Sequence, residues 1–216
     1  MEHGDHRRTL ALSPTIALLV EGETEVAFLP AIRSFLAARL TGAMPRLQPR
    51  PQRGRLPTGE KLKRMVENLL EGLDGCDYVV ALTDVHTGTR EFADAADAIE
   101  KMRRWVGPNP RFHAHAAQHD VEAWLLPYWP KIQKLSGSTR TCPAGPPESV
   151  NHGNPPSRRI MEAYRTGARK RAYKKQVDGA KILEGEDLGI AARRCPELKA
   201  FLDTIIHVIC GGKKIS

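Results

Sequence analysis

Acidic side chains follow three predicted strands of this 216-residue chain. Glu21 ends the apolar run "IALLV", Asp84 ends "YVVALT", and Asp120 and Glu122 follow "RFHAHAAQ". Carboxylates that converge from separate strands repel one another, and a divalent cation bound by their oxygen atoms would balance their charge. Such a cation could activate a water and stabilise the displacement of a phosphoryl group. The alternative is that each acid caps a helix or faces solvent.

The histidines and the absence of common cofactor motifs limit the kinds of site that the sequence supports. His86 lies two residues after Asp84 and is therefore a candidate metal ligand. His113, His115 and His119 alternate along one predicted strand, where a zinc site would need more ligands and a closed second shell. A basic or buried surface is the favoured interpretation of these histidines. The chain contains no G-x-x-x-x-G-K-[ST] loop and no G-x-G-x-x-G loop, the glycine-rich motifs that bind the phosphates of ATP and NAD. No serine lies in a nucleophile elbow, so a Ser/His/Asp hydrolase is not indicated.

Basic residues are concentrated near the end of the chain. The net charge is +8 and the isoelectric point about 9.5, and nine Lys/Arg face two acids between Arg158 and Lys181. This pattern predicts binding of a polyanion such as nucleic acid, with a solvated cationic helix as the alternative. Tyr164 and Tyr173 could stack on bases, and Lys174 or Lys175 could neutralise charge on a transferring phosphoryl group. The candidate nucleic-acid-binding residues are Arg158, Arg159, Arg169, Lys170, Arg171, Tyr173 and Lys174.

Strand and helix patterns alternate over residues 15–125, which predicts a parallel, Rossmann-like sheet. The helix after Glu21 contains Pro30, which either kinks it or begins its regular part after an irregular first turn. Residues 41–59 are rich in Pro, Gly and Arg and are expected to form a loop with one edge strand. In such a sheet, ligands collect beyond the carboxyl ends of the strands, where the acids lie.

In residues 60–73, an apolar stripe that includes Leu73 predicts a helix that is buried along one side.

Two further helical regions are expected after a long loop near the end of the chain. Residues 137–156 are rich in Pro, Gly and Ser, and a loop of this length is usually functional or a linker. The remainder of the chain is expected to be helical over 157–175 and 187–206.

Composition excludes several classes of protein. Hydrophobic residues make up 41% and charged residues 27%, so a packed core is feasible. No apolar run approaches the roughly 20 residues needed to span a bilayer, and the amino terminus lacks the pattern of a signal peptide, so a cytoplasmic location is expected. The four cysteines lie far apart without a C-x-x-C pair and are expected to be reduced.

Five short motifs in order carry a resemblance to a known family. "VEGETE" after a strand, followed by "FLP", resembles the first motif of the Toprim domains in OLD-type nucleases and in the nuclease partners of ABC-like ATPases. The chain most resembles a bacterial family of Toprim-like proteins, domain of unknown function 4276. The matching segments are Glu21-Gly22 with Glu25, the strand end at Asp84, "HDVEAW", "PSRR" and "YKKQVDG".

The resemblance implies a Toprim/Rossmann-like α/β fold with a mostly parallel four-stranded sheet flanked by helices. We expect a domain over residues 1–136 and, packed on it, a loop and basic helical extension over 137–216. The implied catalytic residues are Glu21, Asp84 and Lys175. The implied ligands of Mg²⁺ or Mn²⁺ are Glu21 and Asp84, with Glu25 and Glu122 as supporting acids, and His86 is added as a candidate ligand from its position near Asp84. Toprim enzymes usually present D-x-D where this chain has Asp84-Val85-His86, which favours Mn²⁺ or a single ion.

The function expected from these residues and this resemblance is metal-dependent cleavage of phosphodiester bonds in DNA or RNA. The resemblance also implies an OLD- or ABC-like ATPase partner and a role in defence against phage or mobile elements. The alternative is a catalytically inactive Toprim-like protein that binds nucleic acid or regulates an ATPase.

Overall fold

Four parallel strands form the centre of the molecule. The computed structural model describes residues 13–73, 75–85, 91–149 and 154–210. The sheet has the order β2-β1-β3-β4 and all its pairings are parallel. Its strands are β1 (Thr15–Val20), β2 (Arg46–Pro51), β3 (Tyr78–Val85) and β4 (Phe112–Gln118). The predicted four-stranded, mostly parallel sheet is confirmed, and the carboxyl ends of its strands meet at one edge.

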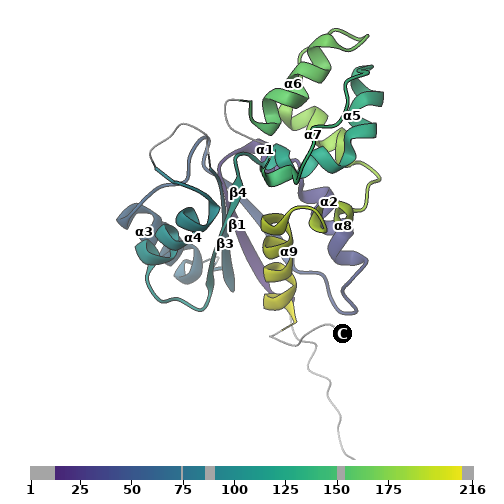
Figure 1. Ribbon diagram of the computed structural model, residues 1–216. Coiled ribbons are helices and arrows are strands. Elements are labelled where there is room, and N and C mark those ends of the chain that lie inside the picture. The colour runs from purple at the N-terminus through teal and green to yellow at the C-terminus, as the bar shows by residue number, and fades with distance from the viewer. Residues whose placement is uncertain (1–12, 74, 86–90, 150–153, 211–216) are drawn as a thin grey trace, which may run out of the picture.

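Helices cover both faces of this sheet (Figure 1). On one face lie α3 (Glu60–Glu71) and α4 (Ala95–Val106). On the other lie α2 (Leu29–Ala37), α8 (Leu188–Ala192) and α9 (Pro196–Ile209). A hydrophobic core lies on each face of the sheet, and alternate residues of β1 point into one or the other. Ala17 and Leu19 pack with α3 and α4, whereas Ile16, Leu18 and Val20 pack in the core with α2, α8 and α9. Burial on both faces explains the continuous apolar runs in the central strands.

The remaining helices gather beyond the carboxyl ends of the strands, where Figure 1 shows α5, α6 and α7. They are α1 (Glu23–Val26), η1 (Val121–Tyr128), α5 (Trp129–Ser136), η2 (Pro147–Ser149), α6 (Pro156–Thr166) and α7 (Lys175–Leu183). Pro30 is the second residue of α2, so the regular helix begins there after the short α1, the second of the two expected alternatives. This arrangement places several helix termini next to the acidic strand ends.

Three sequence-based expectations about helices are wrong. The single basic helix over 157–175 is two helices, because α6 ends before Gly167 and α7 begins at Lys175. A Cβ atom at Gly167 would lie 2.3 Å from the carbonyl oxygen of Ser136, so this glycine permits a close crossing of two segments. The helix expected over 187–206 is divided into α8 and α9 before Pro196. Leu73 is fully exposed, since α3 ends at Glu71.

The carboxy-terminal extension packs on the sheet. α9 contacts β4, and Phe201 and Ile205 share a hydrophobic core with Leu18 and Val20 of β1. Residues on both sides of residue 136 contribute to this core. The division of the chain into two domains at that residue stays a prediction. Among the helices of the described ranges, none has the length and apolar character to cross a bilayer.

Candidate active site

A cavity of about 270 Å³ lies at the carboxyl edge of the sheet. Its lining includes one side chain from or just after each strand: Glu21 after β1, Arg55 after β2, Asp84 in β3 and Glu122 after β4. Lys175, the first residue of α7, also lines it. The structure thus brings together acids that are up to 101 residues apart in the sequence (Glu21 and Glu122, 122 − 21).

Glu21 is held by the neighbouring strand. It is 8% exposed, and its Oε1 accepts hydrogen bonds from the Thr83 hydroxyl and from the backbone N–H of Asp84, the latter at 3.2 Å. β1 and β3 pair directly, which places the end of β1 beside Thr83 and Asp84. The orientation of Glu21 therefore depends on the register of the two central strands.

Asp84 is buried among other carboxylates. Its Oδ1 accepts the backbone N–H of Val121 at 3.1 Å, so this acid also anchors the start of η1. Burial raises the pKa of Asp84 well above its usual range, and the nearby charges of Glu25 and Glu21 raise it further. A carboxyl group of this kind favours a bound cation, which would stabilise its ionised form.

The turn from β4 into η1 is unusual. His119 has a φ of +72°, a left-handed conformation that costs a residue with a side chain roughly 1 kcal/mol. The next residue, Asp120, accepts the backbone N–H of Ser157 through Oδ2 at 3.2 Å, while its buried Oδ1 has no hydrogen-bond partner within the described residues. The strained turn allows Asp120 to point toward α6 and Glu122 toward the cavity.

Glu25 combines a capping role with a place in the site. Its Oε2 accepts the backbone N–H of Gly22 at 3.0 Å, so this acid caps the start of α1, and its place as a metal ligand stays a prediction. Burial raises the pKa of Glu25, and the charge of Glu21 adds to the effect. Glu23, on the same turn, is exposed.

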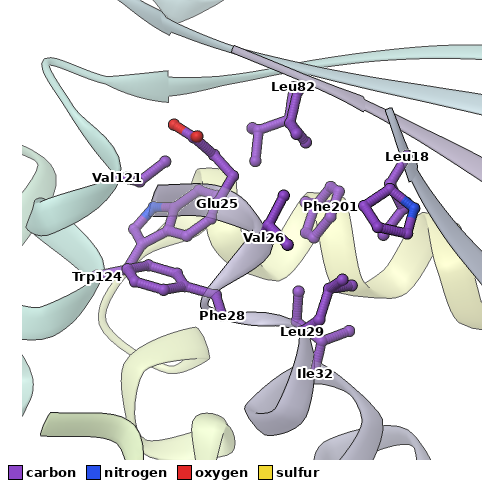
Figure 2. A pocket seen from close by; sticks show the side chains of 12 residues that line it. Leu18, Glu25, Val26, Phe28, Leu29, Ile32, Leu82, Val121, Trp124 and Phe201 are labelled. Atoms are coloured by element: carbon purple, nitrogen blue, oxygen red, sulfur yellow. The ribbon is translucent and has the colours of Figure 1, made fainter. Parts of the chain in front are cut away.

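An apolar layer lies below Glu25. Figure 2 shows the Glu25 carboxylate directed away from Leu29 and Ile32, which line an apolar cavity of about 20 Å³ together with Phe28 and Trp124. This volume is about that of one water-sized probe, so the layer is closely packed. Apart from Glu25 the lining of this cavity is apolar, which is consistent with burial as the largest cause of the raised pKa of Glu25.

Glu122 and Lys175 form an ion pair at the opposite wall. Glu122 is fully buried, and Lys175 Nζ lies 2.9 Å from its Oε1. Burial and the charge of Asp120 raise the pKa of Glu122 to about 7, although Lys175 acts in the other direction. For Lys175, burial favours a lower pKa, but Glu122 and Asp120 outweigh it and the pKa is raised. Lys175 is therefore charged at neutral pH.

Gly179 explains how α7 can lie so close to the site. A Cβ atom at this position would lie 3.2 Å from the ring of Phe28 and 3.7 Å from the hydroxyl of Tyr173. The missing side chain lets α7 pack against α1 and η1. Lys175 is carried by this helix, so the glycine of "YKKQVDG" contributes to the position of the lysine.

The donor set suits a hard divalent cation, but the side chains are not arranged around one. Across residues 13–73, 75–85, 91–149 and 154–210, no three His, Cys, Asp or Glu side chains lie close enough together to hold an ion as placed. Apart from Lys175, Glu122 has no hydrogen-bond partner among these residues. Buried carboxylate oxygens of this kind are the ligands that Mg²⁺ and Mn²⁺ prefer. His86 lies outside the described residues.

The predicted nucleic-acid-binding residues fall into two groups. Arg158 on α6 and Arg169, Lys170 and Lys174 in the segment before α7 are exposed. Arg159 is half-buried, and its Nε donates to the carbonyl of Asn154 at 3.1 Å. Three of the exposed residues, Arg169, Lys170 and Lys174, lie within six residues before Lys175 in the sequence.

Arg171 has a structural role instead. Its two terminal nitrogens donate to the two carboxylate oxygens of Asp178, each at 2.8 Å, and its guanidinium lies 4.5 Å from the centre of the Tyr164 ring. Tyr164 is fully buried, and Tyr173 packs against it with ring centres 5.3 Å apart. The expectation that these two rings form an exposed stacking surface is wrong for Tyr164, and the hydroxyl of Tyr173 is buried.

The strand histidines belong to the packed part of the molecule. His115 is buried and its ring meets Phe201 edge-on at 5.7 Å. Burial lowers the pKa of His115 to about 4 and also lowers that of His113. These residues are neutral at physiological pH, in agreement with the interpretation of a buried surface.

Sequence reasoning missed two residues of the site. Thr83, next to Asp84, donates to Glu21, and Arg55 lines the cavity. The signal for Arg55 was the sequence "RGR" between two prolines directly after the predicted edge strand, which places it at the same edge as the acids.

Comparison with known proteins agrees with this architecture. The family described as "Domain of unknown function (DUF4276)" matches residues 20–206. No curated protein matches the chain. Among solved structures, the C-terminal region of the Burkholderia pseudomallei OLD protein is similar, with a TM-score of 0.50 and 13% identity over 91% of this chain and 98% of that chain. At this identity the likeness establishes the fold.

Proposed function

The chain belongs to the family of domain of unknown function DUF4276, and on that premise we propose that it is a metal-dependent nuclease of the Toprim type that acts on DNA or RNA. The observation that supports this most is the shared cavity, in which Glu21, Glu25, Asp84 and Glu122 face Lys175. A concentration of buried carboxylates beside one lysine is costly for stability and is typical of sites that bind cations and phosphate.

Glu21 and Asp84 form the core of the proposed metal site, with Glu25 and Glu122 as supporting acids. A bound Mg²⁺ or Mn²⁺ would supply Lewis acidity and lower the pKa of a bound water. Lys175 contacts Oε1 of Glu122, whereas Oε2 has no partner among the described residues and is the oxygen available to a cation. Lys175 stays at the cavity, where its charge can stabilise a phosphoryl group, and Thr83 keeps Glu21 oriented.

Exposed cations supply the binding of substrate. Arg158, Arg169, Lys170 and Lys174 can each neutralise a phosphate, and Lys174 directly precedes Lys175. Such contacts position a nucleic-acid backbone without reading its sequence. The proposal also includes an OLD- or ABC-like ATPase partner and a role in defence against phage or mobile elements, supported by the likeness to an OLD protein and by the motif resemblance. It includes a cytoplasmic location, which is the location expected from the sequence.

The test is cleavage of labelled DNA and RNA by the purified protein with Mn²⁺, Mg²⁺ or EDTA. We expect cleavage that requires the metal and falls at least 100-fold in Glu21→Gln. The matched control is Glu23→Gln, since Glu23 is an exposed glutamate two residues away. Equal cleavage by both variants, or cleavage in EDTA, would contradict the proposal.

A second candidate is a protein that binds nucleic acid without cleaving it. The observation that favours it is that no three metal-ligating side chains are close together in the described part of the chain, while Lys175 neutralises Glu122. Salt-dependent binding of nucleic acid without Mn²⁺-dependent cleavage, with and without an ATPase partner, would support this candidate.

A further inference from the structure

The loop after the edge strand β2 carries two arginines to which the proposed function assigns no role. Arg53 and Arg55 are both exposed, and Arg55 lines the same cavity as Glu21 and Lys175. In the strand order, β2 and β4 lie at opposite ends of the sheet. Arg55 therefore reaches the cavity from the β2 end, with Arg53 exposed on the same loop, whereas Glu122 and Lys175 reach the cavity from the β4 end.

The backbone of this loop is fixed to the catalytic strand end. Gln52 donates its backbone N–H to the carbonyl of Val20, and Gly54 donates its own to the carbonyl of Glu21, each at 2.9 Å. Leu56, 7% exposed, anchors the other end of the loop in the core below α3. The backbone that carries both arginines is thus held in place relative to Glu21 before any ligand binds, which lowers the backbone entropy lost on binding.

The conformation of the loop is strained at Arg53. Its φ of +55° lies in the left-handed region, and Gly54 follows with a φ of +143°. A left-handed arginine costs roughly 1 kcal/mol, and a residue without strain would be expected here if the loop served only as a connection. The strain accompanies the turn that allows Gly54 to reach Glu21 and leaves both arginine side chains at the surface.

Arg55 has a partner that a phosphate can replace. Its Nη1 lies 3.2 Å from Glu91 Oε2, and the two side chains are 53% and 28% exposed. Exposed pairs of this kind are worth about 1 kcal/mol or less. Arg55 makes a single contact with Glu91, whereas a phosphate offers several acceptor oxygens to its guanidinium group. Exchange of Glu91 for a phosphate is therefore favourable.

We propose that Arg53 and Arg55 form a phosphate-binding site that holds the nucleic-acid backbone on the β2 side of the carboxylates. This inference rests on the proposed function for the identity of the polyanion. Neighbouring strands lie about 4.8 Å apart, so the distance across four strand ends is roughly 14 Å. At the rise of about 3.4 Å per nucleotide in one strand of a duplex, this distance between the two cationic walls corresponds to roughly four nucleotides, and an extended single strand spans it with fewer. The ligand is therefore a polymer that passes over the acids and contacts both walls.

Fluorescence anisotropy with a labelled 20-nucleotide single-stranded DNA, and with the RNA of the same sequence, tests this site in EDTA between 50 and 200 mM salt. Arg53→Ala and Arg55→Ala are each expected to weaken binding three- to tenfold and to reduce the salt slope by about 0.7. Glu91→Gln, which releases Arg55, is expected to tighten binding. The matched control is Arg64→Ala, because Arg64 on α3 is also exposed and paired with a glutamate, Glu60.

The outcomes separate this inference from the proposed function. Wild-type binding that is unchanged in Arg53→Ala and Arg55→Ala, or equally weakened in Arg64→Ala, would overturn the phosphate site and leave the proposed function standing. Failure of the wild-type protein to bind either nucleic acid in EDTA would overturn the phosphate site, while the metal-dependent cleavage assay decides the proposed function separately. Should Arg55→Ala not fold, Arg55→Lys and Glu91→Gln carry the test: the first is expected to weaken binding and the second to strengthen it, and the reverse of either would contradict the site.

Discussion

Glu122 is the residue in which stability and proposed function conflict most. It is fully buried, and its pKa of about 7 means that it holds a proton over a pH range in which an exposed glutamate has lost it. Lys175 compensates its charge only in part. A group that is costly to ionise without a cation is well suited to bind one, because the cation then stabilises the ionised form.

This conflict predicts a pH dependence of stability without metal. In the unfolded chain Glu122 ionises near 4.5 and in the folded chain near 7, so the folded state binds more protons between these values. The free energy of unfolding therefore falls as the pH rises through this window, by at most about 3 kcal/mol for this residue. Asp84, whose pKa is also raised, acts in the same direction.

Urea denaturation in EDTA at pH 5, 6, 7 and 8 measures this effect. Glu122→Gln is expected to lose part of the decline seen in the wild type and to be the more stable protein at pH 8. Glu23→Gln, an exposed control, is expected to keep the wild-type slope. An identical pH profile for wild type and Glu122→Gln would show that Glu122 does not titrate in this range.

At the scale of elements, the ion pair between Arg171 and Asp178 holds the segment between α6 and α7 in place. From the sequence alone, Arg171 is predicted to bind nucleic acid. Asp178 is 1% exposed, and it accepts two hydrogen bonds from Arg171 and one from the backbone N–H of Lys174 at 2.7 Å. Burial would raise the pKa of Asp178, but Arg171 outweighs it and the pKa is lowered. These contacts fix the start of α7, and with it Lys175.

Arg171→Ala is accordingly expected to destabilise the protein by about 2–4 kcal/mol, since it leaves Asp178 buried without its partner. The neighbouring Arg169→Ala is expected to change the free energy of unfolding by less than about 0.5 kcal/mol, because Arg169 is exposed. Urea denaturation at pH 7 gives both values. Similar losses in the two variants would mean that Arg171 does not hold α7 in place.

These elements also mark what the sequence could and could not predict. Hydrophobic periodicity located the central strands and the helix at 60–71, because each has a buried side with a regular spacing. It did not locate the break at Gly167, which depends on a close approach to Ser136, more than 30 residues away (167 − 136). Nor could charge alone distinguish the paired Arg171 from the exposed Arg169, since that difference arises from tertiary packing.

On the scale of the whole molecule, the parallel sheet explains why the meeting of the acids could be predicted from strand ends. Four strands in the order β2-β1-β3-β4 deliver their following segments to one edge, so acids that end separate strands meet there. The same rule extends to β2, whose contribution is Arg55. The sequence did not show that β2 pairs with β1, and the arginines beside Glu21 were missed for this reason.

Binding of Mn²⁺, followed by electron paramagnetic resonance of the free ion, tests the central claim most directly because it requires neither the substrate nor an ATPase partner. The wild-type protein is predicted to bind at least one Mn²⁺ ion, Glu21→Gln to bind it at least tenfold more weakly, and Glu23→Gln to bind it like the wild type. No binding by the wild type, or equal affinity in all three proteins, would contradict a metal site at the carboxyl ends of these strands.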